Sequence, residues 1–162
     1  MKQNFMEEAL KEAYTGIQNH DGGPFGCVIV KDGRIVGRGH NCVVSGNDPT
    51  RHGEMEAIRD ACKNLNTFDL SGAVLFTTSE PCPMCLGAIL WANIHKVYYG
   101  CTCADAAEIG FRDSDFYDYL NGKSNILELE QQNKMDCKKL FEEYSSMSNN
   151  VKYYLLLNGV ML

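Results

Sequence analysis

Long apolar runs and export signals are missing from this chain of 162 residues. The first stretch, MKQNFMEEALKEAY, carries Glu7, Glu8 and Glu12 where a signal peptide needs an uninterrupted apolar segment. No segment approaches the ~20 apolar residues of a membrane span, and YYLLLNGVML at the end of the sequence is too short for one. We therefore expect a cytoplasmic protein with no membrane partner.

Positive charge is also scarce, because 15 Lys and Arg residues stand against 21 Asp and Glu residues, for a net charge of −6. Binding of nucleic acids rests on lysine and arginine side chains that neutralise phosphates. The longest near-run of basic residues is the short segment KMDCKK at 134–139. The charge balance argues against a nucleic-acid partner, although a local basic patch would escape this argument.

Internal repeats, low-complexity tracts and linkers rich in proline, glycine or serine are absent as well. The length fits one domain of ~100–200 residues, and a chain of this size buries about 70% of its unfolded surface without needing disulfides. We predict a single domain over residues 1–162. In a protein that is not exported, the eight cysteines are expected to be free thiols or metal ligands.

The apolar pattern predicts alternating helices and strands. A first helix is expected over an apolar stripe at 5–17, and a second after a cap at Asp48 or Thr50. A third is expected within SEPCPMCLGAILWAN (79–93), and its apolar residues predict that it is buried. The last is expected over about 132–148, with Leu140, Phe141, Tyr144 and Met147 facing inward. Strands are expected in FGCVIV and RIVGRGHN, joined by a tight turn at Asp32-Gly33, and in AVLFTT, KVYYG and NILEL. Strands that alternate with helices call for parallel pairs with crossover helices. The fold class is therefore α/β, a three-layer αβα sandwich around a mixed five-stranded sheet.

The segment TRHGEMEAI, residues 50–58, places His52 and Glu54 two positions apart at the start of a predicted helix. Residues turn by about 100° per step in a helix, so two such side chains would diverge by roughly 200°. They can serve one pocket only if that pocket lies at the end of the helix.

Cys82 and Cys85, in PCPMC, also lie where a strand passes into a helix. With His52 they form a set of one nitrogen and two sulfur ligands of the kind that zinc prefers. Three protein ligands are typical of a catalytic zinc that keeps one position open for water. Helix N-termini favour thiolates through the helix dipole and free N–H groups.

Glu54 can reach a water at the metal without binding the metal itself, and can carry the water's proton to a leaving group. The pattern H-x-E followed by P-C-x-x-C is typical of zinc-dependent deaminases. Two other interpretations of the cysteines stay open. They could form a redox pair, which leaves His52 and Glu54 unexplained, or a structural zinc site with Cys101 or Cys103 as a fourth ligand.

The segments GGPFGCVIVKDG, GHN, NDPTRHGEMEAIRDAC, TSEPCPMCLGAI and DAAEIGFRDSDFY resemble the cytidine deaminase superfamily and, within it, the bacterial guanine deaminases. The resemblance is close over about residues 3–120 and loose beyond. It implies one Zn²⁺ per subunit on His52, Cys82 and Cys85, with Glu54 as the catalytic proton shuttle. Gly53 stands where the family usually has alanine.

The resemblance also implies a substrate site. Asn41 would hydrogen-bond a purine base, Phe25 would wall the pocket, and the Asp113 carboxylate would read the base, although Asp113 could instead cap the helix that follows. In the family the C-terminal tail, here about 149–162, crosses to a partner subunit and closes its site with an aromatic residue. Tyr154, or its neighbour Tyr153, would take that place in a homodimer, although LLLNGVML continues beyond them.

The implied activity is hydrolytic deamination of a small-molecule purine, guanine to xanthine and ammonia. The alternatives within the superfamily are a tRNA adenosine deaminase and a cytosine- or cytidine-type deaminase. An alternative of another class is a non-catalytic binding module stabilised by zinc.

Overall fold

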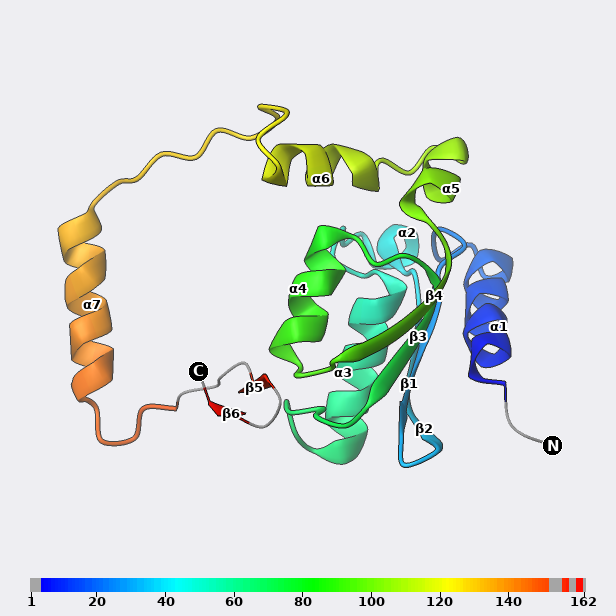
Figure 1. Cartoon of the computed structure of the whole chain (residues 1–162), viewed down its shortest axis with the longest axis horizontal. Coiled ribbons are helices and arrows are strands. Elements are labelled where there is room, and N and C mark those ends of the chain that lie inside the picture. The colour runs from blue at the N-terminus through cyan, green and yellow to red at the C-terminus, as the bar shows by residue number, and fades with distance from the viewer. Residues whose placement is uncertain (1–3, 152–155, 158–159, 162) are drawn as a thin grey trace.

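The computed structural model describes residues 4–151, 156–157 and 160–161. Its main sheet has four strands in the order β2-β1-β3-β4 (Figure 1). β1 (Gly26–Lys31) pairs antiparallel with β2 (Arg34–His40) and with β3 (Val74–Ser79), and β4 (Lys96–Cys101) pairs in parallel with β3. The sheet is therefore mixed, as predicted, and the parallel pair is joined by the crossover helix α4 (Pro83–Trp91).

Helices cover the sheet on both faces (Figure 1). α1 (Phe5–Gln18) packs on one face, while α3 (Gly53–Leu65) and α4 lie over the other. The short helix α2 (Val43–Gly46) follows β2. The three-layer arrangement of the prediction is thus present in the described part of the chain.

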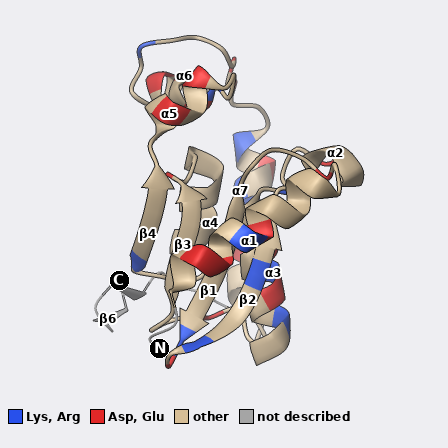
Figure 2. Ribbon diagram, turned by 90° about the vertical axis from the view of Figure 1, so that its right-hand side faces the viewer, with Lys and Arg blue, Asp and Glu red and all other residues tan. Residues whose placement is uncertain are grey.

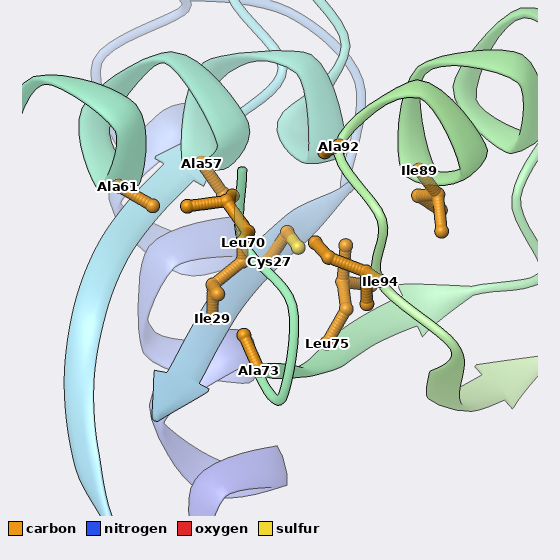
Figure 3. Close-up of a cluster of buried hydrophobic side chains, with 10 residues drawn as sticks. All are labelled: Cys27, Ile29, Ala57, Ala61, Leu70, Ala73, Leu75, Ile89, Ala92 and Ile94. Carbon is orange, nitrogen blue, oxygen red and sulfur yellow. The ribbon is translucent and has the colours of Figure 1, made fainter. Parts of the chain in front are cut away.

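The larger hydrophobic core fills the space between the sheet and helices α3 and α4 (Figure 3). Its side chains share an exposed fraction of 4% or less, and they are Cys27, Ile29, Ala57, Ala61, Leu70, Ala73, Leu75, Ile89, Ala92 and Ile94. A smaller cluster around Ala9, Val28 and Val30 seals the face under α1. β1 is buried on both faces, which explains its unbroken run of apolar residues.

The predicted hairpin turn joins β1 and β2. Asp32 and Gly33 both have a positive φ, of 51° and 74°, which is the left-handed conformation that a two-residue hairpin turn of this kind requires. Asparagine, aspartate and glycine adopt it at the least cost, so the Asp-Gly pair fixes the hairpin locally.

The predicted fifth strand, NILEL at 125–129, is wrong, because no strand is assigned there. Its apolar side chains are largely exposed, at 57% for Ile126, 55% for Leu127 and 78% for Leu129. The remaining described strands, β5 (Leu156–Leu157) and β6 (Val160–Met161), pair with each other rather than with the main sheet. An apolar alternation alone does not make a strand when no sheet edge lies beside it.

The C-terminal part departs most from the expected packing. After α5 (Cys103–Glu108) and α6 (Asp113–Leu120), helix α7 (Lys134–Ser146) stands apart from the sheet and its covering helices (Figure 1). The helix itself was predicted correctly, but the inward direction of its apolar residues was wrong for a single chain. Leu140 is 62% exposed and Phe141 is 72% exposed, and α7 has no buried residue.

The apolar helix within 79–93, which is α4, was predicted to be buried, and this is only partly correct. Cys85 and Ile89 are buried against the sheet, whereas Leu86, Leu90 and Trp91 are exposed. Tyr153 and Tyr154 lie outside the described residues. Within the part that is described, none of the helices combines the length and the apolar character needed to cross a membrane.

Candidate metal centre and substrate pocket

His52 lies at the entrance of helix α3 rather than inside the helix. It is the N-cap residue, with an extended backbone (φ −73°, ψ 158°), and the first helical residue is Gly53. The spacing of His52 and Glu54 is therefore not a helical spacing, and both side chains serve the end of the helix. The predicted cap at Asp48 or Thr50 is wrong, because Asp48 instead accepts hydrogen bonds from the N–H and hydroxyl of Thr50, at 2.8 and 2.7 Å.

Cys82 takes the same place at the start of helix α4. It is the N-cap residue, again extended (φ −66°, ψ 167°), and Pro83 opens the helix. Proline suits the first helical position because its missing N–H would have no partner there. Cys85 follows within the first turn and is fully buried.

The three predicted ligands come together between these helix entrances. The Nδ1 atom of His52 lies 3.6 Å from the Sγ atom of Cys82 and 3.6 Å from that of Cys85. A tetrahedral zinc ion, with Zn–S bonds of about 2.3 Å and a Zn–N bond of about 2.0 Å, holds its nitrogen and sulfur ligands about 3.5 Å apart. The donor set and its spacing fit zinc without rearrangement.

The three groups also influence one another's protonation. Hydrogen bonds from Cys85 and from His52 lower the pKa of Cys82. The hydrogen bond between the two cysteines, together with burial, raises the pKa of Cys85. The hydrogen bond with Cys82 raises the pKa of His52. A cation bound to this cluster would displace the thiol protons, because zinc binds cysteine as the thiolate.

Glu54 lies next to the three ligand atoms and is 5% exposed. Thr77 donates a hydrogen bond to its Oε1 atom at 3.1 Å, and the thiol of Cys85 approaches its Oε2 atom at 3.5 Å. Burial raises the pKa of Glu54 above that of an ordinary glutamate. A carboxyl group with a raised pKa is suited to accept and release a proton near neutral pH.

The described residues contain one further group with ligand atoms within 4.8 Å of one another, Asp21, His40 and Cys42. In that group the Nε2 atom of His40 lies 2.9 Å from the Oδ2 atom of Asp21, so the two side chains bond to each other. Neither Cys101 nor Cys103 belongs to a potential metal group in the described part of the chain. A fourth protein ligand is therefore not in place beside His52, Cys82 and Cys85.

A cavity of about 630 Å³ opens over the three ligands. Its lining includes the predicted residues Phe25, Asn41, His52, Glu54, Cys82 and Asp113. Cys85 lies behind this lining, and Tyr154 is outside the described residues. Protein pockets for small ligands commonly measure about 300–1,000 Å³, so this volume suits a small molecule.

Asn41 is held in one orientation by the backbone. Its Oδ1 atom accepts hydrogen bonds from the N–H groups of Gly23 and Val43, at 3.3 and 3.2 Å, and the residue is 4% exposed. This network assigns the amide oxygen to the backbone and leaves the NH₂ group as the polar end available to the cavity.

Asp113 is the first residue of helix α6 and makes no capping hydrogen bond there. The capping role that the sequence left open is therefore not seen. Burial and the negative charge of Cys82 raise the pKa of Asp113, whereas His52 lowers it. Asp113 lines the same cavity as the predicted metal ligands His52 and Cys82.

Sequence reasoning missed two aromatic residues of the pocket, Phe111 and Phe116. The ring of Phe111 packs edge-on against Phe25, with ring centroids 4.6 Å apart and an interplanar angle of 83°. The available signal was their position two residues before and three residues after Asp113. Nothing in the sequence itself links Phe111 to Phe25.

Gly53 lies close to the backbone of β1. The Cβ atom of an alanine at this position would lie 3.0 Å from the carbonyl oxygen of Phe25 and 3.3 Å from its carbon. The alanine that is usual in the family would therefore require the Phe25 backbone to move by a few tenths of an ångström. Glycine fits the present spacing without such a shift.

Comparison with known proteins agrees with this geometry. Residues 1–101 match the family described as the cytidine and deoxycytidylate deaminase zinc-binding region, and the chain belongs to this family. The chain is 50% identical to the guanine deaminase of Bacillus subtilis over 115 residues. These residues are 71% of this chain and 74% of the Bacillus subtilis protein. The X-ray structure of guanine deaminase from Bacillus subtilis superposes with a TM-score of 0.87 at 41% identity, covering 92% of this chain and 96% of that chain.

A tRNA-specific adenosine deaminase of Streptococcus pyogenes is also 50% identical, but over 96 residues, which are 59% of this chain and 60% of the relative. The two relatives thus have the same percentage identity to this chain. They differ in how much of the chain the similarity covers.

Replacing Cys85 by serine should remove most of the bound zinc, because a hydroxyl is a poor substitute for a thiolate ligand. Zinc per chain, measured by plasma mass spectrometry after dialysis, should fall from about one to below about 0.2. The matched control is His40→Gln, which alters the other cluster and should leave the zinc content unchanged. Equal zinc in wild type and Cys85→Ser would show that the ion is held elsewhere.

Proposed function

We propose that this protein deaminates guanine by hydrolysis, giving xanthine and ammonia. The observation that carries the proposal is one cavity that joins a zinc-type ligand set and a buried glutamate to the Asp113 carboxyl and the Asn41 amide. The similarity of the chain to guanine deaminase, over most of the chain's length, supports guanine as the substrate.

His52, Cys82 and Cys85 would hold one zinc ion per subunit. Zinc in this position supplies a Lewis acid that polarises water and lowers its pKa. Glu54 accepts the proton of the attacking water and transfers it to the ring nitrogen beside C2 of guanine. It then takes the second proton of the former water from the hydroxyl on C2 and delivers it to the departing amine as the C–N bond breaks, so that water and guanine become xanthine and ammonia.

Asp113 and Asn41 would recognise the base from complementary sides. Guanine presents a ring N–H and an amino group, both donors, and an ionised carboxylate can only accept. The NH₂ group of Asn41 supplies a donor to an acceptor atom of the purine, while Phe25 packs against the ring. A base that presents acceptors to Asp113 would leave the half-buried carboxylate unpaired, which costs affinity.

A tRNA adenosine deaminase is the second candidate, because a tRNA-specific adenosine deaminase is also 50% identical to this chain, over 96 residues against 115 for guanine deaminase. The charge around the cavity disfavours it. The segment 103–120 carries the acidic residues Asp105, Glu108, Asp113, Asp115 and Asp118, and one basic residue, Arg112 (Figure 2). Such a surface repels phosphates, whereas binding of RNA needs basic side chains.

Ammonia release tests the proposed reaction and its substrate together. Zinc-loaded protein should release ammonia from guanine faster than from adenine, cytosine, their nucleosides or tRNA. Glu54→Gln should keep its zinc but lose activity by about 10²–10⁴-fold, the size of a general acid–base contribution. Equal or better turnover of adenosine in tRNA would contradict the choice of substrate, and near wild-type turnover by Glu54→Gln would contradict the role of Glu54.

We further propose that the active form is a homodimer in which the C-terminal tail, about 149–162, crosses to the partner. Two exposed apolar surfaces support this: the side of α7 that carries Leu140 and Phe141, and the side of α4 that carries Leu90 and Trp91. Leaving such surfaces in water forfeits about 25 cal/mol for each Å² of apolar area that could be buried. Tyr154, as the aromatic residue that closes the partner's site, stays a prediction.

Mixing two inactive variants tests whether the tail acts on the partner. One variant carries Tyr154→Ala with an intact Glu54, and the other carries Glu54→Gln with an intact tail. Random subunit exchange of equal amounts should restore activity to about a quarter of wild type, since half of the dimers are mixed and each mixed dimer holds one complete site. A mixture no more active than its parents, with exchange verified by mass, would place the tail over its own subunit's site.

A further inference from the structure

Asp113, one of the two residues proposed to read the base, is carried by a segment in which helix α6 has no buried side chain. This recognition segment, residues 103–120, comprises α5 and α6, which lie beyond the ends of β3 and β4 (Figure 1). Helix α6 has no buried residue, although it carries Asp113. The place of the Asp113 carboxyl over the metal centre therefore depends on specific anchors rather than on a core.

Two side-chain hydrogen bonds supply such anchors, and both end on the loop that carries Cys82. The Oε2 atom of Glu80 accepts a hydrogen bond from the N–H of Cys103 at 2.9 Å, at the start of α5. The hydroxyl of Tyr117 donates to the carbonyl oxygen of Pro81 at 2.9 Å, from the middle of α6. Pro81 is the residue before the metal ligand, so α6 is bonded almost directly to the metal centre.

Tyr117 lies one helical turn after Asp113. Residues four apart share one face of a helix, with side chains about 5–6 Å apart at their Cβ atoms. A bond that fixes Tyr117 thus fixes the face of α6 on which Asp113 lies. The edge-on contact of Phe111 with Phe25 adds an apolar anchor just before α6. Because Phe111 lies outside the helix, this contact does not fix the rotation of α6 about its axis.

The hydroxyl of Tyr117 stays a donor over the whole physiological pH range. Burial, together with the nearby charges of Cys103 and Glu80, raises the pKa of Tyr117 to about 12. The carbonyl of Pro81 can only accept. The bond is therefore a constant feature of the site rather than a switch.

We propose that Tyr117 is a positioning residue, whose hydrogen bond to the Pro81 carbonyl sets the place of the Asp113 carboxylate relative to the metal centre. The inference rests on the proposed guanine deaminase function and adds a determinant of base recognition to it. Tyr117 touches neither the metal ligands' donor atoms nor the base, and it acts through Asp113.

The variant Tyr117→Phe removes the hydroxyl and keeps the ring. KM for guanine should rise by about 3- to 10-fold, the size of one net hydrogen bond, while kcat stays within about 2-fold because Glu54 and the metal ligands are untouched. Zinc content should not change. The matched control is Tyr14→Phe on helix α1, which is 61% exposed and should leave both constants unchanged.

A double-mutant cycle with Asp113→Asn shows whether Tyr117 acts through Asp113. The affinity for guanine is measured by calorimetry in Glu54→Gln protein, so that loss of turnover does not hide the result. Tyr117→Phe should weaken binding by about 3- to 10-fold when Asp113 is present, and by less than about 2-fold when it is asparagine.

Equal losses in both backgrounds, or no loss with Asp113 present, would overturn the positioning role while leaving the proposed function intact. Failure of the wild-type enzyme to release ammonia from guanine would overturn the proposed function, and this inference with it. Thermal unfolding of each variant, followed by circular dichroism, identifies any loss that comes from a misfolded protein.

Discussion

The structure depends on the meeting of two helix entrances at one point. His52 and Cys82 are each the last extended residue before a helix, and the sheet register places the two helices, α3 and α4, on the same face. Their donor atoms lie 3.6 Å apart as a consequence. This arrangement supplies free N–H groups, two thiols and an imidazole in a single buried corner, and it leaves the space above them for a substrate.

The residues of the candidate site come from two parts of the chain. The predicted metal ligands, Glu54, Asn41 and Phe25 lie within the N-terminal core, which matches the deaminase family over residues 1–101. Asp113 and the phenylalanines that line the outer pocket lie in the recognition segment that follows. The similarity to a guanine deaminase extends over 115 residues and that to a tRNA-specific adenosine deaminase over 96, both at 50% identity, so percentage identity alone does not distinguish the two substrates. One fold can serve several substrates when the residues of the reaction centre are kept and the segments that contact the substrate differ.

Local features were predictable from the sequence, and features that need a distant partner were not. The Asp32-Gly33 turn and the ligand motif follow from residue types at fixed spacing, and both are present. Within the described residues, no sheet edge receives the predicted strand at 125–129, and no buried residue is found on α7, whose apolar side was predicted to face inward. The contact of Phe111 with Phe25 and the bond of Tyr117 to Pro81 join segments far apart in sequence. Periodicity carries no information about such pairs.

Zinc K-edge absorption spectroscopy of the zinc-loaded protein tests the central claim most directly, because it counts the atoms around the metal. An open catalytic site predicts two sulfur atoms at about 2.3 Å, one imidazole nitrogen at about 2.0 Å and one further light atom from solvent. Three or four sulfur atoms around the zinc would mean that Cys101 or Cys103 closes the site. That result would contradict the catalytic account and favour a structural metal.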